Sequence, residues 1–423
     1  MRLCRIPGKG RRHSGPVKLG LAPGACERGV VLWMVAAAMV MILGVAALAI
    51  DLGAFYAARD EAQSAADAAA LAGAEEFVTS GYTSGAVDSN TVTTLVTQQA
   101  IAVGAEDMVG GQAAQVLSSD VSVDVSVPNN PRVTVTVGRS AARGNALPTL
   151  FAKIFGIKTA DVAAVATAEA YNPSAGDGPP VASECVKPWL IPDCDPDNKG
   201  NPRGVSGCTV AKGSKYWPFI DGDTGAIINP GPVSQGGVVG ETVTYTVAPT
   251  KGKATGKQYY PADVSGGQGN SYLQEIESCT PVPFACGATV PVLNSVQVST
   301  TNNGIQTLIH AAGQGLNTGQ DSIDTSAGPP FTVLAGSQNP YVASGTQIGA
   351  SDSIVSLPLF DSAQGPGNNS SEVILGFIQL FLTQATSGGE INGIVLNVSG
   401  CGQNNQSGQP VEGTTPIPVR LVQ

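Results

Sequence analysis

The stretch that decides the fold is GVVLWMVAAAMVMILGVAALAI, residues 29–50, which runs on into DLGAFYAARDEAQSAADAAALAGAEEF, residues 51–77. Residues 29–50 contain no charged or strongly polar side chain. As a helix they would be roughly 33 Å long, enough to cross a hydrocarbon core of about 30 Å. A buried helix of a soluble protein rarely stays apolar on every face over this length. The sequence therefore predicts a transmembrane helix over residues 29–50.

The charge distribution predicts which end of this helix is exported. The chain carries a net charge of −10, divided into +6 for the basic tail, residues 1–28, and −16 for the rest. Because basic flanks stay in the cytoplasm, we expect the N-terminus inside and the C-terminal domain outside the membrane. Ala47-Leu48-Ala49 leaves a cleavable signal peptide open, but a 28-residue basic region favours an uncleaved signal anchor. The acidic balance argues against nucleic acid as a partner.

Alanine dominates the stretch that follows the apolar run. Eleven of residues 51–76 are Ala and none is Pro, so the membrane helix should continue outward as one long extracytoplasmic α-helix. Small residues recur at intervals of four, which puts them on one face and permits close packing. This face comprises Ala49, Gly53, Ala57, Ala54, Ala58, Ala62, Ala66, Ala70 and Ala74. Either the protein's own exported domain or another helix could pack on this face. In the second case the helix would contact Gly53, Ala57, Ala58 and Ala62.

One combination of residues in this region resembles a known family. After Arg28-Gly29 come Asp51, Gly53, Tyr56, Arg59, Gln63, Ala66, Asp67, Ala69, Leu71 and Gly73. This order resembles the TadE/TadG-like proteins of Flp (tight adherence) pilus assembly. The resemblance implies a single-pass protein of pilus biogenesis or the cell surface, without catalytic activity. It places the N-terminus inside a bacterial cytoplasmic (inner) membrane and the C-terminal domain in the periplasm or on the cell surface. It implies membrane lipid and other pilus-assembly or membrane helices as partners. The D-x-S-x-S metal motif that larger members carry in a von Willebrand A module does not occur in this sequence.

Alternating apolar residues predict a small α/β domain over residues 51–172, with its sheet packed on the long helix. We expect a hairpin, a third strand, two further helices and a linker. The hairpin is expected at 121–127 and 133–137, and the third strand at 162–170. The helices are expected at 92–105 and 148–156, and the linker at 78–90.

A Pro/Gly/Ser-rich linker at residues 173–184 precedes an exported domain, residues 185–423, which we expect to be mainly β and sandwich-like with a few short helices. The predicted strands are 238–247, 290–298, 354–360, 373–382 and 391–398, and the predicted helices are 271–278 and 304–312.

Six cysteines occur in this domain: Cys185, Cys194, Cys208, Cys279, Cys286 and Cys401. An even number in an exported segment favours disulfides over a zinc site, since no C-x2-C spacing is present. Spacing leaves the connectivity open. We expect Cys279 to pair with Cys286 across a Pro-rich loop, Cys185 with its neighbour Cys194, and Cys208 with Cys401 by elimination.

Signals for chemistry are sparse. His310 is the one imidazole beyond the apolar run, and its spacing with Leu308 and Ile309 is typical of a packed or capping residue. Asp193, Asp195 and Asp197 alternate as in calcium loops, but the Gly and Glu that complete such loops are replaced by Asn198 and Gly204. A polar turn held by Cys194 is favoured, and calcium stays open. We therefore expect no catalytic residue, no cofactor and no metal.

Two functions fit these observations. The favoured one is a non-enzymatic, single-pass, membrane-anchored component of Flp pilus assembly or surface display. The alternative is an exported adhesion or binding module that uses the same anchor without a pilus role. The sequence leaves the oligomeric state open.

Overall fold

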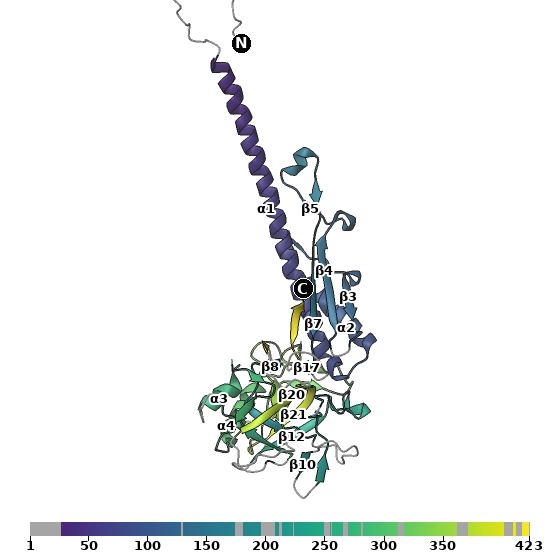
Figure 1. Ribbon diagram of the computed structural model, residues 1–423, viewed down its shortest axis with the longest axis vertical. Coiled ribbons are helices and arrows are strands. Elements are labelled where there is room, and N and C mark those ends of the chain that lie inside the picture. Colours follow the sequence, from purple (N-terminus) through teal and green to yellow (C-terminus); the bar gives the residue numbers. More distant parts are fainter. Residues whose placement is uncertain are drawn as a thin grey trace, which may run out of the picture. The chain divides into compact units, whose positions relative to one another are not determined.

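The computed structural model describes residues 27–127, 130–173, 181–195, 208–210, 214–222, 224–248, 254, 256–264, 270–280, 282–311, 317–361, 371–401, 409–411 and 417–422 (Figure 1). The chain divides into two compact units. The first unit contains residues 1–54 and 148–159, and the second contains residues 55–147 and 160–423. Each is described by itself.

The first unit is built on the N-terminal part of helix α1 (Glu27–Thr79). This is the one helix in the described part of the chain that is long and apolar enough to cross a membrane. Every large apolar side chain from Val31 to Ile50 is exposed, between 51% and 79%. A surface this apolar in water would be unfavourable over such an area, and it suits hydrocarbon. The long apolar helix that continues through the Ala-rich stretch is confirmed.

The rest of the first unit is the 148–159 loop, where the predicted helix over 148–156 is wrong. Strands β5 (Leu147–Pro148) and β6 (Thr159–Ala160) pair with each other, and a single 3₁₀ turn, η4 (Ala152–Phe155), lies between them. Gly156 ends the turn with φ at +86°, a conformation that continues no helix. The Thr149 hydroxyl donates to the Ile157 carbonyl at 2.6 Å and closes the loop.

The second unit begins with an α/β part that the sequence predicted well. Its sheet has the order β23-β7-β4-β3, with all pairs antiparallel. The expected hairpin and third strand are confirmed. The expected helix at 92–105 is present as α2 but begins at Ser89, because the Asp88 carboxylate accepts from the amides of Asn90 and Thr91 at 2.8 and 3.0 Å. The elements are η1 (Tyr82–Ser84), α2 (Ser89–Gly104), β1 (Met108–Val109), β2 (Gln112–Ala113), η2 (Ser118–Asp120), β3 (Val121–Asp124), β4 (Arg132–Arg139), η3 (Ala141–Arg143), β7 (Val162–Ala170) and β23 (Val419–Val422).

The second half of α1 packs its small-residue face into the core of this α/β part, and Figure 1 shows β4 and β7 running beside it. The buried members are Ala58, Ala62, Ala65, Ala66, Ala69, Ala70 and Ala74. They share one core with alternate residues of β4 and β7, such as Val133 and Ala168. Ala58 and Ala62 are therefore covered by the protein's own domain and not by a partner helix. Gly53 and Ala57 are exposed.

The segment expected as a linker at 78–90 is instead a buried junction. Helix α1 runs to Thr79, and η1 is buried along its whole length. The Asn172 side-chain amide donates to the Thr83 carbonyl at 3.0 Å, and the Ser84 hydroxyl donates to Asn397 Oδ1 at 3.2 Å. Asn397 in turn donates to the Val78 carbonyl at 3.2 Å. These bonds tie the α/β part to the strands that follow it in sequence.

The remaining elements form the mainly-β part, whose class is confirmed. They are β8 (Val181–Ser183), β9 (Trp189–Pro192), β10 (Cys208–Val210), β11 (Ser214–Tyr216), η6 (Val233–Gln235), β12 (Thr242–Val247), β13 (Gln258–Pro261), α3 (Asn270–Glu277), β14 (Phe284–Ala285), β15 (Thr289–Pro291), α4 (Val298–Leu308), β16 (Ser322–Asp324), β17 (Thr332–Leu334), β18 (Gln347–Ile348), β19 (Ile354–Phe360), β20 (Ser371–Gln384), β21 (Ile391–Gly400) and β22 (Gln409–Val411). The strand expected at 290–298 is reduced to β15, because α4 begins at Val298.

The largest sheet closes on itself and does not form two facing layers. Its order is β15-β20-β19-β9-β13-β12-β21, and β21 also pairs with β20, which makes a ring of six strands with β15 attached to β20. Pairs β9–β19 and β12–β13 are parallel, and the other pairs are antiparallel. Residues from every strand in the ring, such as Trp189, Tyr245 and Leu380, meet in one core, to which α3 and α4 add Ile276 and Ile305. A closed ring leaves fewer open edges than a sandwich would.

The C-terminus does not stay in this mainly-β part, so the expected domain 185–423 is wrong at its end. Strand β23 pairs with β7, with Val419 opposite Ala170 and Leu421 opposite Ala168. Ile417 lies fully buried in the α/β core. The last residues of the expected linker at 173–184 form a strand instead, because β8 pairs with β14 and β22.

Candidate functional site

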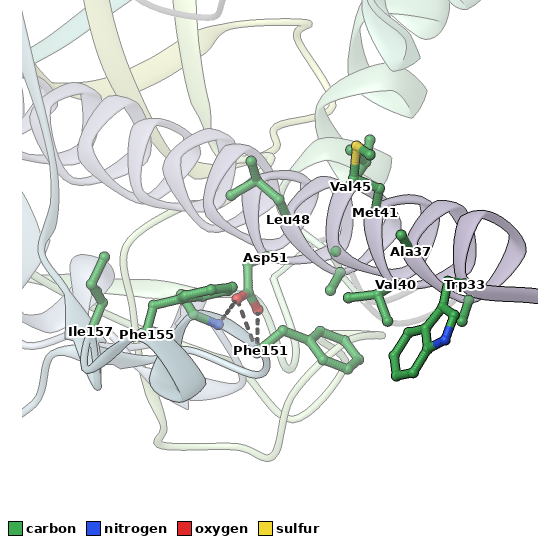
Figure 2. A pocket seen from close by; sticks show the side chains of 14 residues that line it. Trp33, Ala37, Val40, Met41, Val45, Leu48, Asp51, Phe151, Phe155 and Ile157 are labelled. Carbon is green, nitrogen blue, oxygen red and sulfur yellow. Dashed lines mark hydrogen bonds between the residues drawn. The ribbon is translucent and has the colours of Figure 1, made fainter. Parts of the chain in front are cut away.

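The most constrained group of the first unit is the carboxylate of Asp51, which directly follows the apolar run and is 2% exposed. It accepts three backbone N–H groups from the 148–159 loop. Leu150 N donates to Oδ1 at 2.8 Å, Ala152 N donates to Oδ2 at 2.6 Å, and Phe151 N contacts both oxygens at 3.2 and 3.0 Å (Figure 2). These amides open the 3₁₀ turn and have no partner within it, so a side chain distant in sequence caps the turn. Asp51 thereby fixes the 148–159 loop to α1.

An apolar groove of about 840 Å³ lies between α1 and this loop. Its lining is apolar apart from Asp51, and it includes Trp33, Val40, Leu48, Phe151 and Phe155. Figure 2 shows the Phe151 ring directed along the helix towards Val40 and Trp33. The one charged group in the groove is the Asp51 carboxylate, which accepts hydrogen bonds from backbone amides. The site can therefore bind apolar chains, but it offers no general acid–base pair.

The residues of the family motif fall into two groups. Asp51 caps the loop, Gln63 donates to Asp67 Oδ1 at 2.8 Å and to the Val165 carbonyl at 3.3 Å, and Ala66, Ala69 and Gly73 are buried. Gly53, Tyr56 and Arg59 are exposed, and Leu71 is half-buried. The first group serves this protein's own fold, and so does Leu71, which packs against the α/β core. The three exposed residues are available to the surroundings of the helix.

The cysteines form disulfides, but the expected pairings are wrong. Cys185 pairs with Cys279, and Cys286 pairs with Cys401. Strand β20 explains the second pair, because Gly287 N donates to the Ile374 carbonyl at 2.9 Å and Cys401 N donates to the Leu375 carbonyl at 3.0 Å. The first pair follows from the hydrogen bond of Cys185 N to the Thr280 carbonyl at 3.2 Å. Cys279–Cys286, Cys185–Cys194 and Cys208–Cys401 are thus replaced. Cys194 is also disulfide-bonded, and the side chain of Cys208 lies outside the described residues.

Of the three alternating aspartates that resemble a calcium loop, Asp193 has a structural role. Asp193 Oδ1 accepts from the amides of Phe219 and Ile220 at 2.9 and 3.1 Å. Complete burial raises the pKa of Asp193 to about 8, which disfavours the charged form that a cation would need. Asp195 is buried, and Asp197 lies outside the described residues. Within the described part of the chain no cluster of three metal-ligating side chains occurs.

His310 follows α4 and lies between two carboxylates, as expected of a packed residue at a helix end. Its Nε2 is 3.0 Å from Asp352 and its Nδ1 is 3.3 Å from Asp321. The nearby Ser351 hydroxyl donates to Asp321 at 2.7 Å and not to the imidazole. These described contacts do not have the order of a Ser-His-Asp triad, in which the serine contacts the histidine.

Together these features define a protein with one long apolar helix, an α/β part packed on its continuation, and a disulfide-linked β-ring. The family model described as putative Flp pilus-assembly TadE/G-like matches residues 29–76, which confirms the resemblance for the apolar run and the small-residue face. Comparisons with curated proteins and with solved structures found no match. The matched segment lies within α1, so the match gives no information about the β-ring.

Sequence reasoning missed the link between Asp51 and the 148–159 loop. Asp51 was selected as a motif residue without a role, and the loop was assigned to a helix. One signal was present: the run LFAKIFGIK, residues 150–158, combines five large apolar side chains with two lysines. That composition is typical of a surface that contacts lipid.

Proposed function

We propose that this protein is a non-enzymatic, single-pass, membrane-anchored component of Flp pilus assembly or surface display. The observation that carries the proposal is that the family match spans both the exposed and the buried part of α1. The family match covers residues 29–76, and within it the exposed apolar helix gives way to the Ala face buried in the α/β core. A helix that is bare over one half and packed over the other suits a membrane anchor joined to a folded exterior domain.

The proposal includes an orientation. The basic tail would lie in the cytoplasm, and the disulfide-linked β-ring would lie outside it, where disulfides persist. The exposed small residues Gly53 and Ala57 would then lie just outside the membrane. Apart from the backbone of its own helix and its chain neighbours, no heavy atom lies within 4 Å of a Cβ built on Gly53, so another helix of the pilus machinery could approach closely there.

Protease added to spheroplasts tests the orientation. We expect degradation beyond roughly residue 50 and protection of an epitope on the N-terminal tail. Protection of the β-ring would contradict the proposal, and a mature N-terminus near Ile50 would show a cleaved signal peptide instead.

The pilus role is tested by localisation and piliation. The full chain should co-localise with the pilus machinery, and its deletion should reduce surface pili. As a control, Gly53→Leu and Ala57→Leu should lower co-purification with membrane partners while the protein still inserts, because larger side chains block approach without lowering hydrophobicity. Normal piliation and unchanged localisation in cells without the machinery would contradict this role.

A second function has one observation in its favour. The family match stops at residue 76, and the closed β-ring, which carries two described disulfides, lies outside the matched segment. Such a part would suit an exported adhesion or binding module that uses the same anchor. Binding of cells to a surface that depends on the β-ring but not on the pilus genes would favour this function over the first.

A further inference from the structure

The 148–159 loop exposes more apolar surface than a loop in water normally keeps. Leu150, Ile154, Phe155 and Ile157 are 53%, 75%, 79% and 56% exposed. Single exposed apolar residues are ordinary, but a contiguous group of large ones marks a contact surface. This surface is continuous with the apolar face of α1, because Phe151, Phe155 and Ile157 line the same groove as helix residues.

Resting on the proposed membrane anchor, we propose that the 148–159 loop is a second membrane contact. It lies in the interface of the outer leaflet beside the end of the apolar helix, with its apolar side chains among phospholipid acyl chains. Lys153 and Lys158 are exposed in the same loop, where they can reach lipid phosphates while their stems stay in the apolar layer.

The backbone of the loop is suited to this environment. Near hydrocarbon, an amide without a hydrogen-bond partner is strongly unfavourable. Asp51 accepts from Leu150, Phe151 and Ala152, as described above. Four further amides bond within the loop: Thr149 N to Lys158 O at 3.1 Å, Ile154 N to Phe151 O at 3.0 Å, Gly156 N to Lys153 O at 3.1 Å and Ile157 N to Ala152 O at 3.2 Å. Asp51 is thus a positioning residue that allows a non-helical segment to enter the interface.

Lipid fits this surface better than a protein partner. A protein interface normally offers polar groups for hydrogen bonds around its apolar centre. Here the groove contributes Asp51 alone, whose oxygens are occupied, and the surface otherwise consists of aliphatic and aromatic side chains flanked by two cations. Aromatic rings and lysines beside an apolar layer are the composition of membrane interfaces.

Photocrosslinking in the full chain tests the proposal. The chain is reconstituted into vesicles of phosphatidylcholine and phosphatidylglycerol, with a benzophenone amino acid at one position at a time. We expect lipid adducts at Phe155 and at Ile42 in the apolar helix. A matched control is Val233 in the second unit, which is 53% exposed and should give background yield.

The outcomes separate this inference from the proposed function. Adducts at Ile42 but only background at Phe155 would overturn the inference and leave the membrane anchor in place. Background at both positions would contradict the anchor itself. Adducts of Phe155 to another protein or to a second copy of the chain would assign the loop to protein docking instead.

Two variants test the roles of the charged residues. Asp51→Asn should lower the lipid adduct at Phe155 while the yield at Ile42 stays unchanged, because the Asn Nδ2 group that replaces one carboxylate oxygen cannot accept from the loop amides, whereas the helix still inserts. Lys153→Glu with Lys158→Glu should remove any gain in yield that phosphatidylglycerol gives over phosphatidylcholine alone. An unchanged Phe155 yield in Asp51→Asn would overturn the positioning role.

Discussion

At the residue scale, side-chain size decides how each half of α1 is used. A Cβ added to Gly73 would lie 3.3 Å from Val133 Cγ1 and 3.4 Å from Ala100 Cβ, so the helix approaches both β4 and α2 at this point. Gly53 lies on the same helix in open surroundings. Identical residues therefore serve different purposes, one inside the core and one on the surface.

This difference gives a matched pair of variants. Gly73→Leu should destabilise the full chain by about 1–3 kcal/mol, because the added atoms overpack the junction of α1, α2 and β4. Gly53→Leu should be neutral or slightly stabilising, because leucine is the better helix former and meets no neighbour. The denaturant midpoint of the protein in detergent measures both. Equal midpoints for the two variants would show that α1 does not pack as described.

At the scale of elements, β20 organises the disulfide pairing. It is the longest strand in the described part of the mainly-β region, and it pairs with β15, β19 and β21. Its residues Ile374 and Leu375 accept from both segments that carry Cys286 and Cys401. The bridge joins cysteines 115 residues apart, so it restricts the unfolded chain far more than a bridge between sequence neighbours.

Mass spectrometry of non-reduced peptides should find Cys185 linked to Cys279 and Cys286 linked to Cys401. Removal of the second bridge by Cys286→Ala with Cys401→Ala should lower the free energy of unfolding by about 5 kcal/mol in the loop-entropy estimate. The loss should be seen as a lower thermal midpoint of the double variant than of the oxidised full chain without these substitutions. A peptide linking Cys279 to Cys286 would contradict the pairing.

At the scale of the whole molecule, the chain returns at its C-terminus to the four-stranded sheet of the α/β part. Strand β23, the yellow strand beside β7 in Figure 1, covers an edge of the α/β sheet. Its Arg420 donates to the buried carboxylate of Glu169 at 2.8 Å, which also accepts from Arg132 at 3.0 Å. The α/β part is therefore complete only when the last residues have been added.

Ending the chain after Pro416 tests this closure. The truncation removes Ile417, which is fully buried, and the pairing of β23, so a loss of at least about 3 kcal/mol is expected. The amide of Tyr171, which donates to the Pro418 carbonyl at 2.9 Å, should exchange its hydrogen much faster. Deletion of Gln423 alone is the control. Unaltered protection of Tyr171 in the truncated chain would contradict the contribution of β23.

The sequence by itself determined the elements whose patterns are local. Twenty-two apolar residues before an Ala-rich run allow only a long helix, and the alternation of valines and alanines at 121–127, 133–137 and 162–170 determines strands with one buried face. The family resemblance rested on the same local order, and the match over residues 29–76 confirms it.

Tertiary structure alone decided the partners of these elements. The closure of β20 onto β21, the return of β23 to β7 and the cysteine pairs join positions far apart in sequence, and spacing carries no information about such contacts. The 148–159 loop shows the same limit: its apolar spacing fits a helix, but the Asp51 carboxylate, about a hundred residues away, supplies the cap that holds a single 3₁₀ turn. The helical preference of this segment is overridden because Asp51, which lies on another element, accepts hydrogen bonds from the loop's backbone amides.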